Sequence, residues 1–160
     1  MLAASRMSRG ALYHHFASKE ALFEAVLEEV EAGIAETIVR SARRATDPVG
    51  VLRAGCKAWL RVSEDPAAHQ IALVDAPAVV GWQRWREIDE GHAFGLLQRA
   101  LEAVAATGRL RADVVDVLAH MLLAAMLEVA LVIARAPDRK AALQSGEKAV
   151  DELLDRLVGA

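Results

Sequence analysis

The sequence predicts an all-α fold made of one domain, or of one domain with a small appendage. Alanine and leucine dominate the composition, and the 160 residues contain only 10 glycines and 4 prolines, so residues that favour helices greatly outnumber those that break them. Apolar residues recur at spacings of three and four, the period of an amphipathic helix. Helix-capping residues followed by proline stand at two starts, Asp47-Pro48 and Asp65-Pro66.

The stretch Ser8–Leu22, SRGALYHHFASKEAL, has the pattern of a short helix, a tight turn and the start of a long helix. Ser8 is a suitable N-cap for the short helix, and Ser18 for the helix that opens at Lys19. Met1–Lys19 holds three basic residues and no acidic one, whereas Glu20–Glu36 is strongly acidic. A basic tip on an acidic body indicates local phosphate contact, since the net charge of the whole chain is −3.

The free face of the short helix carries side chains that suit a DNA major groove. Gly10 permits close approach, and Arg9 can bind a guanine edge or a phosphate. Tyr13 and Lys19 can hold the DNA backbone. His14 lies on the same exposed face.

The same stretch resembles the end of the helix-turn-helix in TetR-family transcriptional repressors. The family hallmark is a Ser, then Leu-Tyr-x-His-Phe, then Lys-Glu-x-Leu, which stand here as Ser8, Leu12–Phe16 and Lys19–Leu22. An ordinary helical hairpin with a polar outer face is the alternative. The resemblance implies a TetR-like fold and contact with operator DNA, through base edges for Arg9, Gly10 and His14 and through phosphates for Ser8, Tyr13 and Lys19.

The N-terminal part of that helix-turn-helix is expected to be missing. Family members carry two helices before the recognition helix, whereas Met1–Met7 alone precede it in this sequence. Two hypotheses follow. The chain is a ligand-responsive repressor that acts as a homodimer, or it is a truncated dimeric module that binds small molecules or partners and no longer binds DNA.

We expect the chain to consist of two segments, with a weakly marked boundary near Ala45–Asp47. Residues 1–45 form the partial DNA-binding head, in which an amphipathic helix runs from Lys19 to about Arg43 with apolar residues every fourth position. Residues 46–160 form the ligand-binding and dimerisation domain. A helix follows Pro48, a shorter one follows Pro66 and is expected to end before Pro77, and one long helix is expected from Trp82 to Ala106.

The segment Asp113–Ala134 is apolar almost all the way round. It reaches the length of a membrane span, but Glu128 near its middle would be costly in lipid. A helix of this kind also results when one face packs in its own domain and the other against a partner subunit. The last helix, capped by Asp138, carries small residues at Ala142, Ser145, Gly146 and Ala149, so we expect two such helices per subunit to form a four-helix bundle.

An effector pocket is expected between the middle helices, because family members enclose one there and such pockets are apolar with a few polar groups. The candidate ligand-binding residues are Trp59, His69, Trp82, Trp85, His92, Met121 and Glu128, with Asp75 considered beside them. Core packing is the alternative for the tryptophans, and a core histidine with one hydrogen bond is the alternative for His92. For Asp75, an aspartate before Pro77, a cap or turn is favoured over contact with a ligand.

The sequence offers little support for catalysis. It has no glycine-rich phosphate loop, no cysteine pair and no HExxH motif, so we expect no enzyme, metal or cofactor. Cys56 is the one cysteine, which fits a reducing compartment; it is either a small buried hydrophobe or a redox sensor. No signal peptide opens the sequence, and we expect a cytoplasmic protein without membrane contact.

Overall fold

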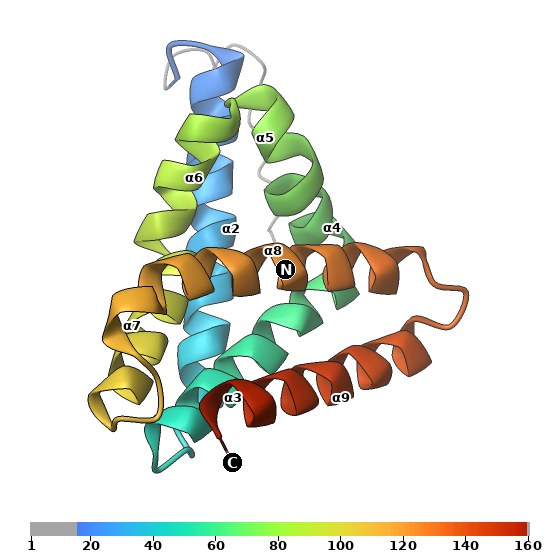
Figure 1. Ribbon diagram of the computed structural model, residues 1–160. Helices are drawn as coiled ribbons and strands as arrows, with labels where there is room; N and C mark the ends of the chain where they lie inside the picture. The colour runs from blue at the N-terminus through green and yellow to red at the C-terminus, as the bar shows by residue number, and fades with distance from the viewer. Residues whose placement is uncertain (1–15, 160) are drawn as a thin grey trace.

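The computed structural model describes residues 16–159, apart from the side chain of Ser63, and the regular structure in this range is helical. The prediction of an all-α fold is confirmed. Figure 1 shows the long helix α2, and α8 and α9 lying side by side. The α-helices are α2 (Lys19–Ala42), α3 (Pro48–Leu60), α4 (Pro66–His69), α5 (Ala76–Val79), α6 (Trp82–Gly91), α7 (Ala93–Ala106), α8 (Val115–Arg135) and α9 (Arg139–Val158).

Four helices begin at the capping residues that the sequence indicates, and one of these residues, Asp65, caps α4 by accepting from the N–H groups of Ala67 and Ala68. Ser18, Asp47 and Asp138 each accept a hydrogen bond from the backbone N–H three residues later, at 3.1, 3.0 and 2.9 Å respectively. Each bond satisfies one of the donors that a helix leaves unpaired at its first turn. These starts were readable from sequence because a cap depends on neighbours along the chain.

The segment around Pro77 differs from expectation. The helix does not end before this proline: α4 continues through a π-helical segment, Gln70–Asp75, directly into α5. Pro77 is the second residue of α5 and lacks the N–H that a continuing helix would use, and the carbonyl oxygen of Ala72, five residues earlier, accepts from the indole of Trp85. A local change of helix type therefore carries the chain past a residue that normally stops a helix.

The prediction of a single helix from Trp82 to Ala106 is also wrong, because the helix breaks at His92 into α6 and α7. His92 adopts φ −122° and ψ −109°, outside the helical region. The break brings the end of α6 against the start of α7 so closely that a Cβ on Gly95 would lie 2.3 Å from the carbonyl oxygen of Glu90. Glycine at this position is what permits the approach.

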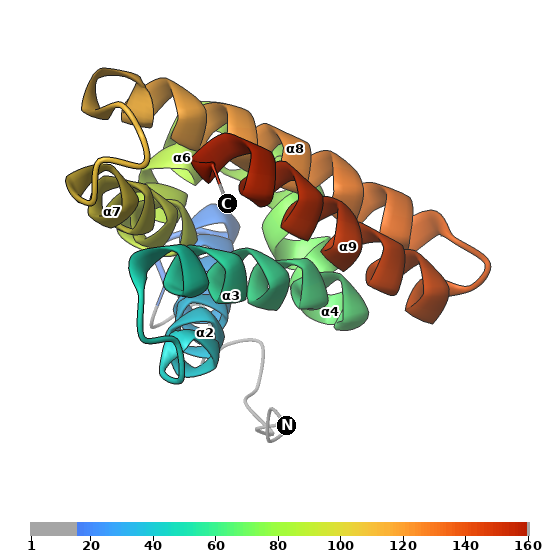
Figure 2. The same ribbon diagram turned by 60° about the horizontal axis from the view of Figure 1, so that its bottom comes forward.

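Helix α3 lies at the centre of the domain and contacts α2, α7, α8 and α9 (Figure 2). Its apolar face is buried, with Leu52 and Leu60 almost fully removed from solvent. Its other face is joined to α9 by ion pairs, among them Arg53–Asp151 at 2.9 Å and Lys57–Asp151 at 2.5 Å. The domain is thus layered, with α2 on one side of α3 and the α8–α9 pair on the other.

Helices α8 and α9 pack closely on each other because Gly146 of α9 has no side chain to hold α8 away. A Cβ at Gly146 would lie 3.0 Å from Val129 and 3.2 Å from Ile133. The opposite face of this helix pair is exposed and mostly apolar. We call it the outer stripe, defined by Val117, Met121, Ala124, Ala125, Glu128 and Val132 on α8 and by Ala141, Ser145, Ala149 and Leu153 on α9.

Candidate functional site

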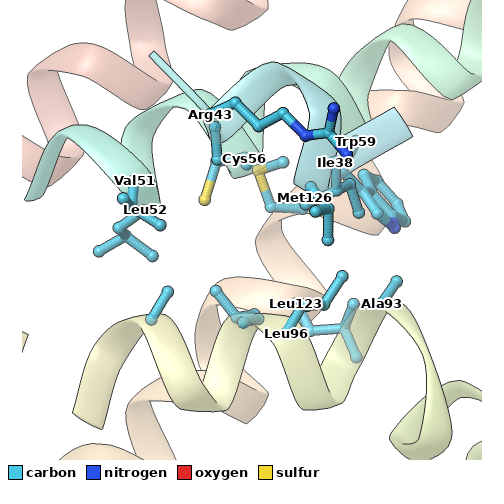
Figure 3. A pocket seen from close by; sticks show the side chains of 15 residues that line it. Ile38, Arg43, Val51, Leu52, Cys56, Trp59, Ala93, Leu96, Leu123 and Met126 are labelled. Carbon is cyan, nitrogen blue, oxygen red and sulfur yellow. The ribbon is translucent and has the colours of Figure 1, made fainter. Parts of the chain in front are cut away.

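An apolar cavity of about 270 Å³ lies where α2, α3, α7 and α8 meet. Figure 3 shows side chains from these helices surrounding the open space. All but one of the lining residues are uncharged, and Arg43 is the exception. The wall is made by Ile38, Val39, Ala42, Arg43, Val51, Leu52, Gly55, Cys56, Trp59, Ala93, Leu96, Leu97, Ala100, Leu123 and Met126.

Small residues account for the space. Ala42, Gly55, Ala93 and Ala100 face the cavity from three helices, at positions where larger side chains would fill it. A close-packed interior leaves few voids larger than a water molecule, so an apolar space of this volume can hold part of an organic molecule. Its size approaches the lower end of the range for ligand pockets.

An open groove adjoins the cavity, between α2 on one side and the α6–α7 break and α7 on the other. The two spaces share Val39, Arg43 and Leu96, so the cavity wall is also the wall of the groove. We call it the arginine groove, because Arg40, Arg43 and Arg99 line it, together with Glu36 and His92 among polar residues. An apolar chamber therefore opens beside a surface with an excess of positive charge.

Of the seven predicted ligand-binding residues, Trp59 lines the cavity and His92 lines the groove. Trp59 is 8% exposed and comes from α3. Met121 and Glu128 line neither space and belong to the outer stripe, with Met121 62% exposed. Their effector role stays a prediction, and their placement favours contact with another protein.

The remaining three predicted residues lie around the middle helices. Trp85 is buried, and its indole N–H donates to the carbonyl oxygen of Ala72 at 2.9 Å, so it ties α6 to the π-helical segment. Trp82 is 61% exposed and packs against Trp85 with the ring centroids 4.8 Å apart and the ring planes tilted by 50°. His69 lies on α4, where burial and then the charges of two arginines lower its pKa. The seven residues thus do not meet in one site.

Sequence reasoning missed Arg43 and the small residues of the cavity wall. Arg43 is the C-cap residue directly after α2 and in the sequence looks like a solvated cation at the end of a helix. The small residues lie on stripes that also carry large apolar residues, as Gly55 lies beside Leu52 and Trp59. A stripe interrupted by small residues on several helices could signal a cavity, but their meeting in space depends on helix packing.

Contacts between polar side chains connect α2 to α6 and to the break between α6 and α7. Glu24 pairs with Arg84, and Glu28 lies 2.8 Å from the Nε2 of His92. One turn further along α2, Glu31 is buried and lies close enough to Asp89 of α6 for the two carboxylates to affect each other. The alternative reading of His92 as a histidine with one hydrogen-bond partner is thus consistent with its position, although it also borders the groove.

The predicted DNA-binding residues Ser8, Arg9, Gly10, Tyr13 and His14 lie outside the described residues, so the structure says nothing of their positions. Lys19 is described. It is the first residue of α2, directly after the Ser18 cap, and its side chain is exposed. Exposure at this position leaves it accessible to a phosphate.

Cys56 forms part of the cavity wall and is 6% exposed. Burial raises the pKa of its thiol to about 12, which disfavours the reactive thiolate. This environment favours the packing role over redox sensing. No cluster of three metal-ligating side chains occurs among residues 16–159.

Comparisons with known proteins agree with this architecture. Residues 49–157 match the sequence profile described as "Tetracyclin repressor-like, C-terminal domain", and residues 2–26 match "Bacterial regulatory proteins, tetR family". No curated protein is similar enough in sequence to count as a match. The profile match to residues 49–157 covers more than half of the chain.

Two solved structures are similar. A TetR-family transcriptional regulator from Pectobacterium atrosepticum is 30% identical, with a TM-score of 0.76 over 95% of this chain and 78% of its own. A bacterial regulatory protein in the TetR family from Rhodococcus RHA1 shares the fold, at 18% identity and a TM-score of 0.71 over 95% of this chain and 80% of its own. This chain belongs to the TetR family of transcriptional regulators, which bind DNA and are not enzymes.

Proposed function

We propose that the protein is a ligand-responsive repressor that acts as a cytoplasmic homodimer on operator DNA. The observation that carries the ligand response is the position of the apolar cavity against the C-terminal end of α2. The N-terminal end of the same helix falls within the segment that matches the DNA-binding part of the family. One continuous helix therefore connects an effector chamber to the DNA-binding head.

Because α2 is long, a change in its tilt at one end moves its other end. Its 24 residues span about 36 Å, and a helix of this length transmits a tilt from one end to the other. A ligand in the cavity would contact Ile38 and Ala42 near one end and would displace the start of α7. The Glu28–His92 contact, at the α6–α7 break, would carry that displacement back to α2. The effector works by favouring one of two positions of α2.

The outer stripe supports a homodimer. Val117 and Met121 are 60% and 62% exposed on α8, while Val132 is 58% and Leu153 45% exposed further along the helix pair. A contiguous apolar face on two antiparallel helices would be buried by a two-fold related copy, giving a four-helix bundle. The small residues on α9, Ser145 and Ala149, allow close approach of that copy.

A membrane is the less favoured occupant of this surface. Ala112–Arg135 is long and apolar enough for a span by length and composition, with a mean hydropathy of 2.3 in its most apolar window. However, α8 packs against α3, α7 and α9, and its exposed face carries Asp116, His120 and Glu128. Charged groups on the exposed face disfavour lipid contact.

Met121→Lys tests the homodimer. We expect the variant to sediment as a monomer, because a charge would be buried in the subunit interface without a partner. Val79→Lys is the matched control, since Val79 is 43% exposed on α5 and lies off the outer stripe. A wild-type chain that sediments as a monomer at micromolar concentration would contradict the proposed assembly.

Selection of operator sequences from a random duplex library tests DNA binding by the full chain. We expect sequence-selective binding that weakens steeply with salt, as phosphate contacts require. Lys19→Ala should lower the salt slope by about one, whereas Arg9→Ala should relax base selectivity. An absence of binding at low salt would favour the alternative, a dimeric ligand-binding or interaction module.

A further inference from the structure

We propose that the effector is a monocarboxylate with an unbranched or compact apolar body, held with its carboxylate on Arg43. This inference rests on the proposed effector role of the cavity. Two observations lead to it: the volume and composition of the apolar cavity, and the charge of the arginine groove that shares a wall with it.

The cavity sets the size of the apolar body. An apolar cavity of roughly 150 Å³ in another protein accepts benzene, a molecule of six carbons. By that scale the present cavity of about 270 Å³ holds roughly ten non-hydrogen atoms. Its lining offers Leu96, Leu123 and Met126 for dispersion contacts, which favour a hydrocarbon over a polar molecule such as a sugar or nucleoside.

Arg43 sets the charge of the ligand. Its side chain lines both spaces, and Figure 3 shows it extended alongside the cavity, with the guanidinium group on the side of Trp59 and Ile38. Within residues 16–159 neither Arg43 nor Arg99 has a carboxylate partner. A guanidinium group binds a carboxylate with paired, charge-assisted hydrogen bonds, so an acidic head group fits this position.

The other polar groups of the groove leave this charge in place. Arg40 donates to the hydroxyl of Thr37 at 3.0 Å, so its positive charge adds to that of Arg43, while Glu28 lies against His92. Glu36 is the one acidic lining residue, against three arginines. A neutral or cationic ligand of the same shape would gain nothing from this excess of positive charge.

Calorimetry on the full chain, without DNA, tests the proposal with three probes of one shape: octanoate, 1-octanol and octylamine. We expect octanoate to bind at least about tenfold more tightly than 1-octanol, with octylamine weakest, since one charge-assisted contact is worth about that factor. Raising the salt concentration should weaken octanoate and leave 1-octanol unchanged.

Two variants locate the contact. Arg43→Gln should reduce octanoate affinity to that of 1-octanol, while Arg44→Gln should leave it unchanged, because Arg44 is an exposed neighbour that lines neither space. Gly55→Leu should abolish binding of octanoate and 1-octanol by filling the cavity, with the helical circular dichroism of the variant as the control for folding.

Four results would overturn the proposal: equal affinity for octanoate and 1-octanol, equal losses in Arg43→Gln and Arg44→Gln, octanoate binding that survives in a folded Gly55→Leu variant, or no binding of any probe. The proposed function fails separately. Octanoate binding that has no effect on the affinity for selected operator DNA would support this ligand class and contradict the ligand response.

Discussion

Glu31 offers a sharp test of how the α2–α6 contact is held. Its side chain is 3% exposed, and within the described residues it has no hydrogen bond or ion pair. Burial, followed by the charges of Asp89 and Glu28, raises its pKa from 4.5 to about 8. Protonated Glu31 is therefore the form that the folded protein favours.

The sign of the pH dependence follows. A carboxyl whose pKa is raised on folding contributes its full stability below its unfolded pKa of 4.5. The free energy of unfolding then falls as the pH rises from 4.5 through the folded value near 8. Each pH unit in this window costs about 1.4 kcal/mol, and the full shift corresponds to at most about 5 kcal/mol. Asp89, with its pKa raised to about 6 chiefly by burial, adds a loss of the same sign at lower pH.

Glu31→Gln removes the charge while keeping the shape. We expect the variant to be more stable than wild type by about 2–4 kcal/mol at pH 8. At pH 5 the variant should be as stable as wild type or less stable by about 1 kcal/mol, because a buried amide has more hydrogen-bonding groups to satisfy than a protonated carboxyl. Urea unfolding followed by circular dichroism, at pH values from 5 to 8.5, measures both differences.

Glu29→Gln is the matched control, because Glu29 lies on the same helix and is exposed. Its stability curve should run parallel to that of wild type across the pH range. Parallel curves for Glu31→Gln and wild type would refute the reasoning, since they would mean that Glu31 ionises in the folded protein as easily as in the unfolded chain.

Two further substitutions test the packing of the helices. Gly95→Ala should destabilise the fold by about 1–3 kcal/mol, because the added Cβ would lie 2.3 Å from the Glu90 carbonyl oxygen. Gly91→Ala is the control and should be neutral or slightly stabilising, since no neighbouring atom lies within 4 Å of its new Cβ. Thermal unfolding compares the two variants with wild type. Asp151→Asn should cost about 1 kcal/mol at pH 7, because it weakens the pairs with Arg53 and Lys57 at partly exposed positions. Burial alone would raise the pKa of Asp151, but hydrogen bonds from Lys57 and Arg53 outweigh burial and lower it. The stability advantage of wild type over the variant is therefore present above the unfolded pKa of 3.8 and disappears as the pH falls through the lowered folded value. An advantage that persists in urea unfolding at pH 2 would contradict this explanation.

The sequence by itself determined the helical class, most helix starts and the family. Caps such as Ser18, Asp47 and Asp138 depend on bonds to residues three positions along the chain, so local sequence is sufficient for them. The apolar period of α2 and the all-round apolar character of α8 likewise appear in the order of residues alone. The family resemblance needs no structure either, because Ser8–Leu22 carries its motif as fixed spacing.

Tertiary structure decided where helices break and which side chains meet. The break at His92 and the passage through Pro77 depend on a close helix approach and a π-helical segment, neither of which has a local signal strong enough to predict. The cavity depends on small residues from three helices facing one space, and Arg43 joins it only because α2 ends beside α3 and α7. Spacing along one helix fixes which residues share its face, but the partner of that face is set by packing between helices distant in sequence.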